Sequence, residues 1–235
     1  IAPNLAQAHI ALGYALLNDT LDFRTAVPEY ARARTLAPND PNIALSYANL
    51  AYQSGRDADA VAAMAFAESR DPLNPFVYRI EAEIDQAARR YDAVAAKANH
   101  ALSLNPQLPM AHALIASSLL ARGRFADALK EIGHEPDEVF RLVGTAIAQH
   151  GLGNATAAKA AFDQLVRSHG DEAIYQQAQI QAQIGPPDVA MAALMRAYAL
   201  KDGGMLFILG DFTLDPLRNR PEFAQLLARM GLGRV

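Results

Sequence analysis

The chain has 235 residues, of which 51% are hydrophobic and 20% charged, so a well-buried core is easy to build and disorder is not expected. A formal net charge of −4 provides no basic field for a nucleic-acid backbone, so we expect this segment itself to bind no nucleic acid. The absence of cysteine excludes a disulfide scaffold, a thiolate zinc site and a thiol nucleophile.

Composition also bears on fold class and compartment. The chain is rich in alanine, has 7% aromatic residues and lacks tryptophan, which favours close-packed helices over a β core. No apolar run reaches membrane-spanning length, so we expect no spanning segment in this chain. A chain without thiols suits the cytoplasm and the periplasm alike, and the cytoplasm is slightly favoured.

A repeat of 34 residues runs through the first half of the chain. Pro38, Pro72 and Pro106 are spaced by this period, and each closes a similar segment. Small or β-branched residues recur at fixed distances before these prolines, namely Ala26, Ala60 and Val94, followed by Ala33, Ala67 and Ala101. Small side chains at fixed positions let two helices cross closely, so each period predicts a pair of antiparallel helices.

The predicted helical pairs follow one another along residues 1–200. Asp40-Pro41 and Asn74-Pro75 read as a helix N-cap followed by proline at the first helical position, which marks where new pairs begin. In the fourth pair, Gly133 and Pro136 cut the second helix short. The predicted units cover residues 6–40, 41–74, 75–108, 109–138, 139–170 and 171–200.

Residues 201–235 leave the repeat pattern. Here a turn is followed by a proline-started helix in which Phe223, Leu226, Leu227 and Met230 share one face. Repeat arrays need covered ends, so we expect this segment to cap the sixth unit.

The 34-residue pattern resembles the tetratricopeptide repeat, and the resemblance covers nearly the whole chain. It implies an all-α, right-handed superhelical solenoid of about six helical hairpins with a C-terminal capping segment. The tail is similar to the C-terminal end of bacterial regulators in which such an array follows a winged-helix DNA-binding domain (CadC-type transcriptional activators) or a nucleotide-cyclase domain. The matching residues are Asp215, Pro216, Leu217, Arg218, Pro221, Phe223, Leu226, Leu227, Met230, Gly231 and Leu232.

The tail departs from the regulator pattern at Glu222, where the family often has arginine, and at Asn219-Arg220, which replaces a more acidic pair. These departures put the subfamily in doubt and leave the capping role intact. At the other end, Ile1-Ala2-Pro3-Asn4 repeats the ending Leu36-Ala37-Pro38-Asn39. We therefore expect Pro3 to close an earlier helical pair, and the chain to be the C-terminal part of a longer protein.

Candidate binding residues lie on the first helix of each pair, which lines the concave face of such an array. The predicted partner-binding positions are Tyr14, Asn49, Tyr52, Arg79, Glu83, Gln86 and Ser117, with His150 as a further exposed position. They describe a polar groove for an extended peptide or a partner helix. The carboxylate clamp of chaperone-binding repeats is mostly absent, because only Asn49 and Arg79 occupy suitable places.

Sequence motifs for catalysis or metal binding are not found. The six histidines form no paired metal-ligand spacing on one helix, and His9 and His112 occupy equivalent repeat positions where packing explains them. Glu81 and Asp85 are spaced for joint acid–base or metal chemistry, but pairing with Arg56, Arg89 or Arg90 explains them better. We expect no enzyme activity, catalytic residue, metal or cofactor.

The sequence favours a non-catalytic protein-interaction domain of a bacterial signalling or transcription regulator. The partner would be a protein or peptide in the concave groove, or a second copy in a homodimer. The alternative is a small-molecule sensor that relays ligand occupancy to an N-terminal DNA-binding or cyclase module, with Tyr14, Tyr52 and Arg79 as anchors. A purely structural spacer is a third hypothesis.

Overall fold

The computed structural model describes residues 5–233, and this range is all-helical. Helical residues make up 79% of the described chain, and no strand occurs in it. The predicted all-α class and the solenoid of six helical hairpins are therefore confirmed. The predicted closing proline, Pro3, lies outside the described residues.

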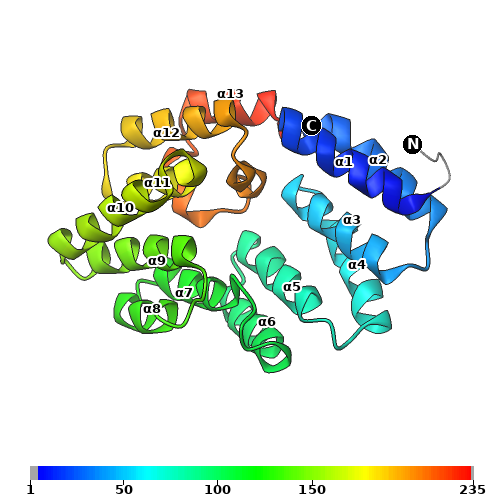
Figure 1. The fold of residues 1–235 in the computed structure, drawn as a ribbon, viewed down its shortest axis with the longest axis horizontal. Coiled ribbons are helices and arrows are strands. Elements are labelled where there is room, and N and C mark those ends of the chain that lie inside the picture. Colours follow the sequence, from blue (N-terminus) through cyan, green and yellow to red (C-terminus); the bar gives the residue numbers. More distant parts are fainter. Residues whose placement is uncertain (1–4, 234–235) are drawn as a thin grey trace.

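Each hairpin consists of two antiparallel α-helices joined by a short turn, and the six hairpins follow one another around a curve (Figure 1). Their bounds are α1 Ala6–Thr20 and α2 Phe23–Leu36; α3 Pro41–Gln53 and α4 Asp57–Arg70; α5 Pro75–Ala87 and α6 Tyr91–Leu104; α7 Ala111–Ala121 and α8 Phe125–Ile132; α9 Glu138–Gly151 and α10 Ala155–His169; α11 Ile174–Ile184 and α12 Pro187–Leu200. A 3₁₀ turn, η1 Gly170–Ala173, precedes α11.

Local sequence signals place the helix ends. The side chain of Asp40 accepts a hydrogen bond from the backbone N–H of Asn42 at 2.9 Å, and that of Asn74 accepts one from Phe76 at 3.0 Å. These caps satisfy amide groups that have no partner inside the helix. The second helix of the fourth hairpin is short, as expected from Gly133, and ends at Ile132.

The C-terminal segment does more than cover the sixth hairpin: residues 203–217 lie on the concave side of the curve, and residues 221–229 lie between α12 and α1 (Figure 1). It consists of two 3₁₀ helices, η2 Gly203–Phe207 and η3 Phe212–Leu217, and a last helix, α13 Pro221–Arg229. One buried cluster joins Phe23 and Tyr30 of the first hairpin to Leu194 of the sixth, with Leu214 and Phe223 of the tail between them. The tail thus connects the last hairpin to the first, and the array closes into a ring.

Polar contacts reinforce the junction between the two ends of the array. The backbone N–H of Phe23 donates to the carbonyl of Met230 at 2.9 Å, and the Lys201 ammonium donates to the carbonyl of Thr20 at 3.3 Å. The contacts span about 200 positions in sequence, so they exist only when the whole array is folded. Among the described residues, no helix has the length and apolar character needed to cross a membrane.

Candidate functional site

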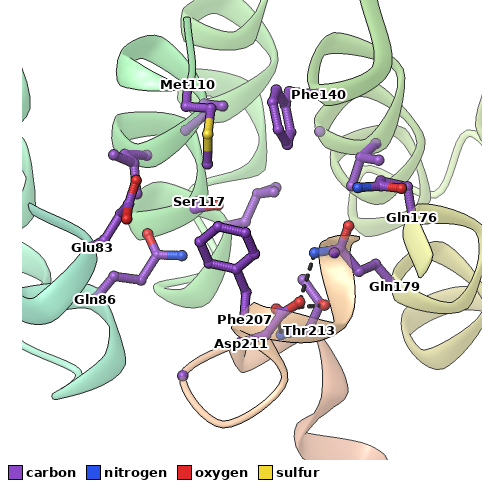
Figure 2. A pocket seen from close by; sticks show the side chains of 18 of the residues that line it. Glu83, Gln86, Met110, Ser117, Phe140, Gln176, Gln179, Phe207, Asp211 and Thr213 are labelled. Carbon is purple, nitrogen blue, oxygen red and sulfur yellow. Dashed lines mark hydrogen bonds between the residues drawn. The ribbon is translucent and has the colours of Figure 1, made fainter. Parts of the chain in front are cut away.

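A pocket of 260 Å³ lies on the concave side of the ring, lined by helices of five hairpins and by the tail (Figure 2). We call it the central pocket. It is lined by Tyr52, Glu83, Gln86, Ala87, Met110, Ala113, Leu114, Ala116, Ser117, Leu120, Ile132, Phe140, Val143, Gly144, Ile147, Tyr175, Gln176, Gln179, Gly204, Phe207, Gly210, Asp211 and Thr213. These residues span the chain from α3 to η3, so they come together through the curvature of the array and the path of the tail across its concave side.

On the α5 side of the central pocket, Glu83 carries the negative charge. The carboxylate accepts a hydrogen bond from the hydroxyl of Tyr52 at 2.6 Å and forms an ion pair with Arg79 one helical turn earlier. Burial raises the pKa of Tyr52 well above its ordinary value near 10, and the charge of Glu83 adds to the effect. Tyr52 therefore remains a neutral donor, and Glu83 has both oxygens occupied.

On the tail side, Asp211 is the second buried carboxylate. One of its oxygens accepts from the hydroxyl of Tyr175 at 2.8 Å and the amide of Gln179 at 2.6 Å. The other accepts from the backbone N–H of Thr213 at 2.9 Å and from the Thr213 hydroxyl at 2.7 Å. Burial, followed by the charge of Asp211, raises the pKa of Tyr175 well above 10. Four neutral donors thus hold the Asp211 carboxylate, and the Arg218 guanidinium donates to the backbone carbonyl of the same residue at 2.9 Å.

The rest of the wall is mostly apolar. Phe207 of the tail stands between the two polar sides, and Met110 and Phe140 lie across the pocket from it (Figure 2). Gly144 lets α8 and α9 approach closely, since a Cβ atom there would lie 2.5 Å from Ile132. The pocket can therefore hold an apolar body between aromatic rings and a thioether.

Three neutral polar side chains in the wall have unused hydrogen-bonding capacity. Gln86, Ser117 and Gln176 form no side-chain hydrogen bond with any other described residue. The amide oxygen of Gln86 is buried from solvent and has no donor. Apart from this oxygen, which a molecule in the pocket cannot reach, the polar atoms of the three side chains are free to contact a ligand.

The predicted binding residues separate into two groups. Tyr52, Glu83, Gln86 and Ser117 line the central pocket, and Arg79 bonds to Glu83 beside it. Tyr14 of α1 and Asn49 of α3 are not part of its wall, and neither is the exposed His150.

One aspect of the prediction was wrong. Tyr52 and Glu83, expected on an exposed concave surface, are each only 6% exposed. Phe207 of the tail packs against the apolar cluster that contains Tyr52, and the tail thus covers this part of the concave face. Sequence reasoning missed Gln176, Gln179, Phe207 and Asp211, which line the same pocket. The position of Gln176 and Gln179 on the first helix of the sixth pair was the available signal.

Polar groups outside the pocket are engaged in structural contacts. Asp85 forms an ion pair with Arg90, which is one of the expected partners. Glu81 pairs instead with Lys97, which was not among them. His112 bonds to Glu131 on the second helix of its own hairpin at 2.7 Å, and His9 bonds in the same way to Glu29 at 2.6 Å. Within residues 5–233, no group of three His, Asp or Glu side chains is arranged to hold a metal ion.

No protein-family model and no curated protein matches the chain. Among solved structures, a chain of the APC/C hetero-tetramer Cut9–Hcn1 is 14% identical with a TM-score of 0.63, covering 97% of this chain and 43% of that one. A tetratricopeptide repeat protein from Parabacteroides merdae is 15% identical with a TM-score of 0.54, covering 96% and 92%. The fold is the tetratricopeptide-repeat solenoid. PilW, a type IV pilus biogenesis factor, is 20% identical over 71% of this chain and 79% of its own, with a TM-score of 0.59. At these identities the tetratricopeptide likeness concerns the fold alone.

Proposed function

We propose that this tetratricopeptide-repeat domain is a non-catalytic interaction domain of a bacterial signalling or transcription regulator, and that a small ligand in the central pocket controls its contacts. The protein-interaction role is supported by the repeat architecture, which offers extended surfaces to partners. A structural neighbour with this architecture belongs to a hetero-tetramer. The regulator context rests on the sequence of the tail, from Asp215 to Leu232.

The size of the central pocket carries the ligand part of the proposal. An engineered cavity of about 150 Å³ holds benzene, so by proportion 260 Å³ holds about ten non-hydrogen atoms. An extended peptide needs far more room, and the tail occupies the concave side where it would lie. A metabolite-sized molecule fits the pocket better than a peptide does.

The position of the pocket supports a sensing role. Its wall includes α5, α7, α9, α11 and the tail, and the same tail holds the first hairpin against the sixth. A ligand that contacts all these elements binds the closed ring better than any opened form. It would therefore shift the array toward the closed state by its difference in affinity.

The chemistry of the wall supports binding without catalysis. Both carboxylates are held by internal donors, Glu83 by Tyr52 and Arg79, and Asp211 by four hydrogen bonds. No histidine or lysine belongs to the lining residues. A general base or an activated nucleophile needs a free, suitably perturbed group, and none stands in this wall.

A thermal-shift screen of metabolites and peptides tests the proposal. The wild-type protein is compared with Ala113→Phe, which fills the pocket, and with Ala126→Phe, a matched change at an exposed position of α8. A true ligand stabilises by mass action, so a metabolite should raise the Tm of wild type and Ala126→Phe but not of Ala113→Phe. If only peptides stabilise, and Ala113→Phe responds as wild type does, the ligand part of the proposal is wrong and the protein-interaction part stands.

A further inference from the structure

We infer that the central pocket selects an uncharged molecule with a flat apolar body and a carboxamide-like end, and that it rejects anions. This inference rests on the proposed ligand-binding function and names the class of ligand. It follows from the charges, the free hydrogen-bonding groups and the shape of the wall.

Anions are disfavoured by the charges around the pocket. No lysine, arginine or histidine is among the lining residues, whereas Glu83 and Asp211 are both there. The nearest cation to Glu83, Arg79, is already its ion-pair partner. A carboxylate or phosphate would lose its hydration on entering a site with two carboxylates and no free cation, which is unfavourable.

A cationic ligand gains little binding free energy, although two carboxylates line the pocket. Glu83 receives the Tyr52 hydroxyl and the Arg79 guanidinium on its two oxygens. Asp211 receives two donors on each of its oxygens, at 2.6 to 2.9 Å. A ligand ammonium would have to break one of these internal bonds to make its own, so it would exchange contacts without adding any.

The polar side chains of the wall that have no hydrogen-bond partner are all neutral. Gln86 on α5 and Gln176 on α11 face the pocket from opposite sides, and Ser117 lies between them on α7 (Figure 2). The oxygen of Gln86 is closed to solvent, so this side chain offers its N–H₂ group to the pocket, whereas Gln176 offers both a donor and an acceptor. A carboxamide carries the same donor–acceptor pair and can satisfy these groups, whereas a hydrocarbon cannot.

The apolar part of the wall sets the shape of the remainder of the ligand. The rings of Phe140 and Phe207 and the thioether of Met110 border the same space (Figure 2). Aromatic faces and polarizable sulfur pack well against a planar ring. The volume of 260 Å³ accommodates a ring and a substituent of about ten non-hydrogen atoms together.

Three probes of nearly identical shape test the inference: benzamide is neutral, benzoate is anionic and benzamidine is cationic. Binding is followed by the methyl resonance of Met110 in the pocket wall, with Met64, buried in the second hairpin, as internal control. Benzamide should shift the Met110 signal at concentrations that leave Met64 unmoved. Benzoate and benzamidine should each need at least about tenfold higher concentrations, because they lack the matched donor–acceptor pair or bring an uncompensated charge.

Matched substitutions identify the groups responsible. Gln86→Leu and Gln176→Leu keep similar volume and remove the amide, and each should weaken benzamide binding by about fivefold, the worth of one hydrogen bond. Gln107→Leu, at an exposed glutamine outside the pocket wall, should leave it unchanged. Far-UV circular dichroism of each variant checks that the helical array is retained.

The outcomes separate this inference from the proposed function. Tighter binding of benzoate or benzamidine than of benzamide would overturn the selectivity for neutral amides and leave a ligand pocket in place. Equal benzamide binding by the wild type and both glutamine variants would overturn the assigned contacts, and with them the inference. If no probe moves Met110, the inference fails, whereas the ligand part of the proposed function is decided separately by the thermal-shift screen with Ala113→Phe.

Discussion

At the scale of single residues, Asp211 determines how the tail sits in the ring. It is 8% exposed and accepts hydrogen bonds from Tyr175, from Gln179 and twice from Thr213. Two of these partners are on α11, and the third is in the tail itself. A single carboxylate therefore fixes both the local turn of the tail and its attachment to the sixth hairpin.

Replacing this carboxylate tests its contribution to stability. Asp211→Asn keeps the size but presents an amide N–H₂ to donors that need an acceptor, leaving at least one buried donor unpaired. We expect the free energy of unfolding to fall by about 2–4 kcal/mol in urea denaturation. Asp188→Asn, at an exposed ion pair with Arg220, should stay within about 0.5 kcal/mol of wild type. Equal losses for the two variants would contradict the role assigned to Asp211.

The buried tyrosines predict a loss of stability in alkali. In the unfolded chain a tyrosine ionises near pH 10, whereas the folded-state pKa values of Tyr52 and Tyr175 are raised well above 10 by burial and by the neighbouring carboxylates. Above about pH 10 the unfolded state therefore binds fewer protons than the folded state, and stability falls as the pH rises. Their contribution is fully present below pH 10.

Urea denaturation at a series of pH values measures this slope. Tyr175→Phe should have lower stability at neutral pH, because Asp211 loses a donor. Its free energy of unfolding should nevertheless fall less steeply than that of wild type above about pH 10, since one of the most strongly perturbed tyrosines is gone. An unchanged slope would show that Tyr175 is not protected from ionisation.

At the scale of elements, small residues control how the helices of one hairpin cross. Ala60 in α4 and Ala128 in α8 are fully buried, at the positions that the 34-residue period assigns to close contacts. Leucine at either position should lower the free energy of unfolding by about 1–3 kcal/mol through overpacking. Ala62→Leu, on the exposed side of α4, is the control and should have little effect. Chemical denaturation that ranked Ala62→Leu with the other two would contradict the register.

The turn of the third hairpin combines a strained backbone with a tail contact. The corresponding turns contain Gly55 and Gly123 with φ of +76° and +71°, but here Arg89 adopts a φ of +60°. This left-handed conformation is unfavourable for a residue with a Cβ atom. The Arg89 guanidinium donates to the carbonyl of Gly210 at 3.2 Å and to Asp215 at 2.6 Å. An arginine occupies a glycine position and holds the tail.

Two substitutions separate the destabilisation by the strained backbone at Arg89 from the stabilisation by its hydrogen bonds to the tail. Arg89→Ala and Arg89→Gly both lose the bonds to the tail, but only glycine relieves the backbone. The glycine variant should be more stable than the alanine variant by about 1 kcal/mol in thermal or chemical denaturation. If the alanine variant is the more stable one, the turn is not strained.

At the scale of the whole molecule, the repeat period predicted the hairpins and could not predict the ring. The period depends on local helix contacts, which recur in sequence, and the fold class follows from them. Tyr52, Glu83, Gln86 and Ser117 could be placed on the concave side by the same reasoning. The path of the tail depends on contacts with both α11 and the first hairpin, and these contacts do not recur in the sequence with the 34-residue period. The period therefore could not predict that Asp211 and Phe207 line the pocket.

Closure makes the first hairpin depend on residues about 200 positions away. Deleting residues 219–235 removes α13 and Met230, which accepts the hydrogen bond of Phe23, but leaves the pocket wall up to Thr213 intact. In an open array, the loss of a terminal element destabilises only its neighbours. In a ring, it also exposes the buried face of the first hairpin that the cluster around Phe223 covers.

Hydrogen exchange measured by mass spectrometry should therefore show faster exchange in α1 and α2 of the deletion variant, with α7 to α9 close to wild type. Phe223→Ala, at a ring that is 1% exposed, should have the same pattern in weaker form and lower the free energy of unfolding by about 3–5 kcal/mol. Gln225→Ala, exposed on the same helix, is the control. If exchange rises in α11 and α12 but not in α1 and α2, the tail caps the sixth hairpin alone, and closure contributes nothing to the stability of the first.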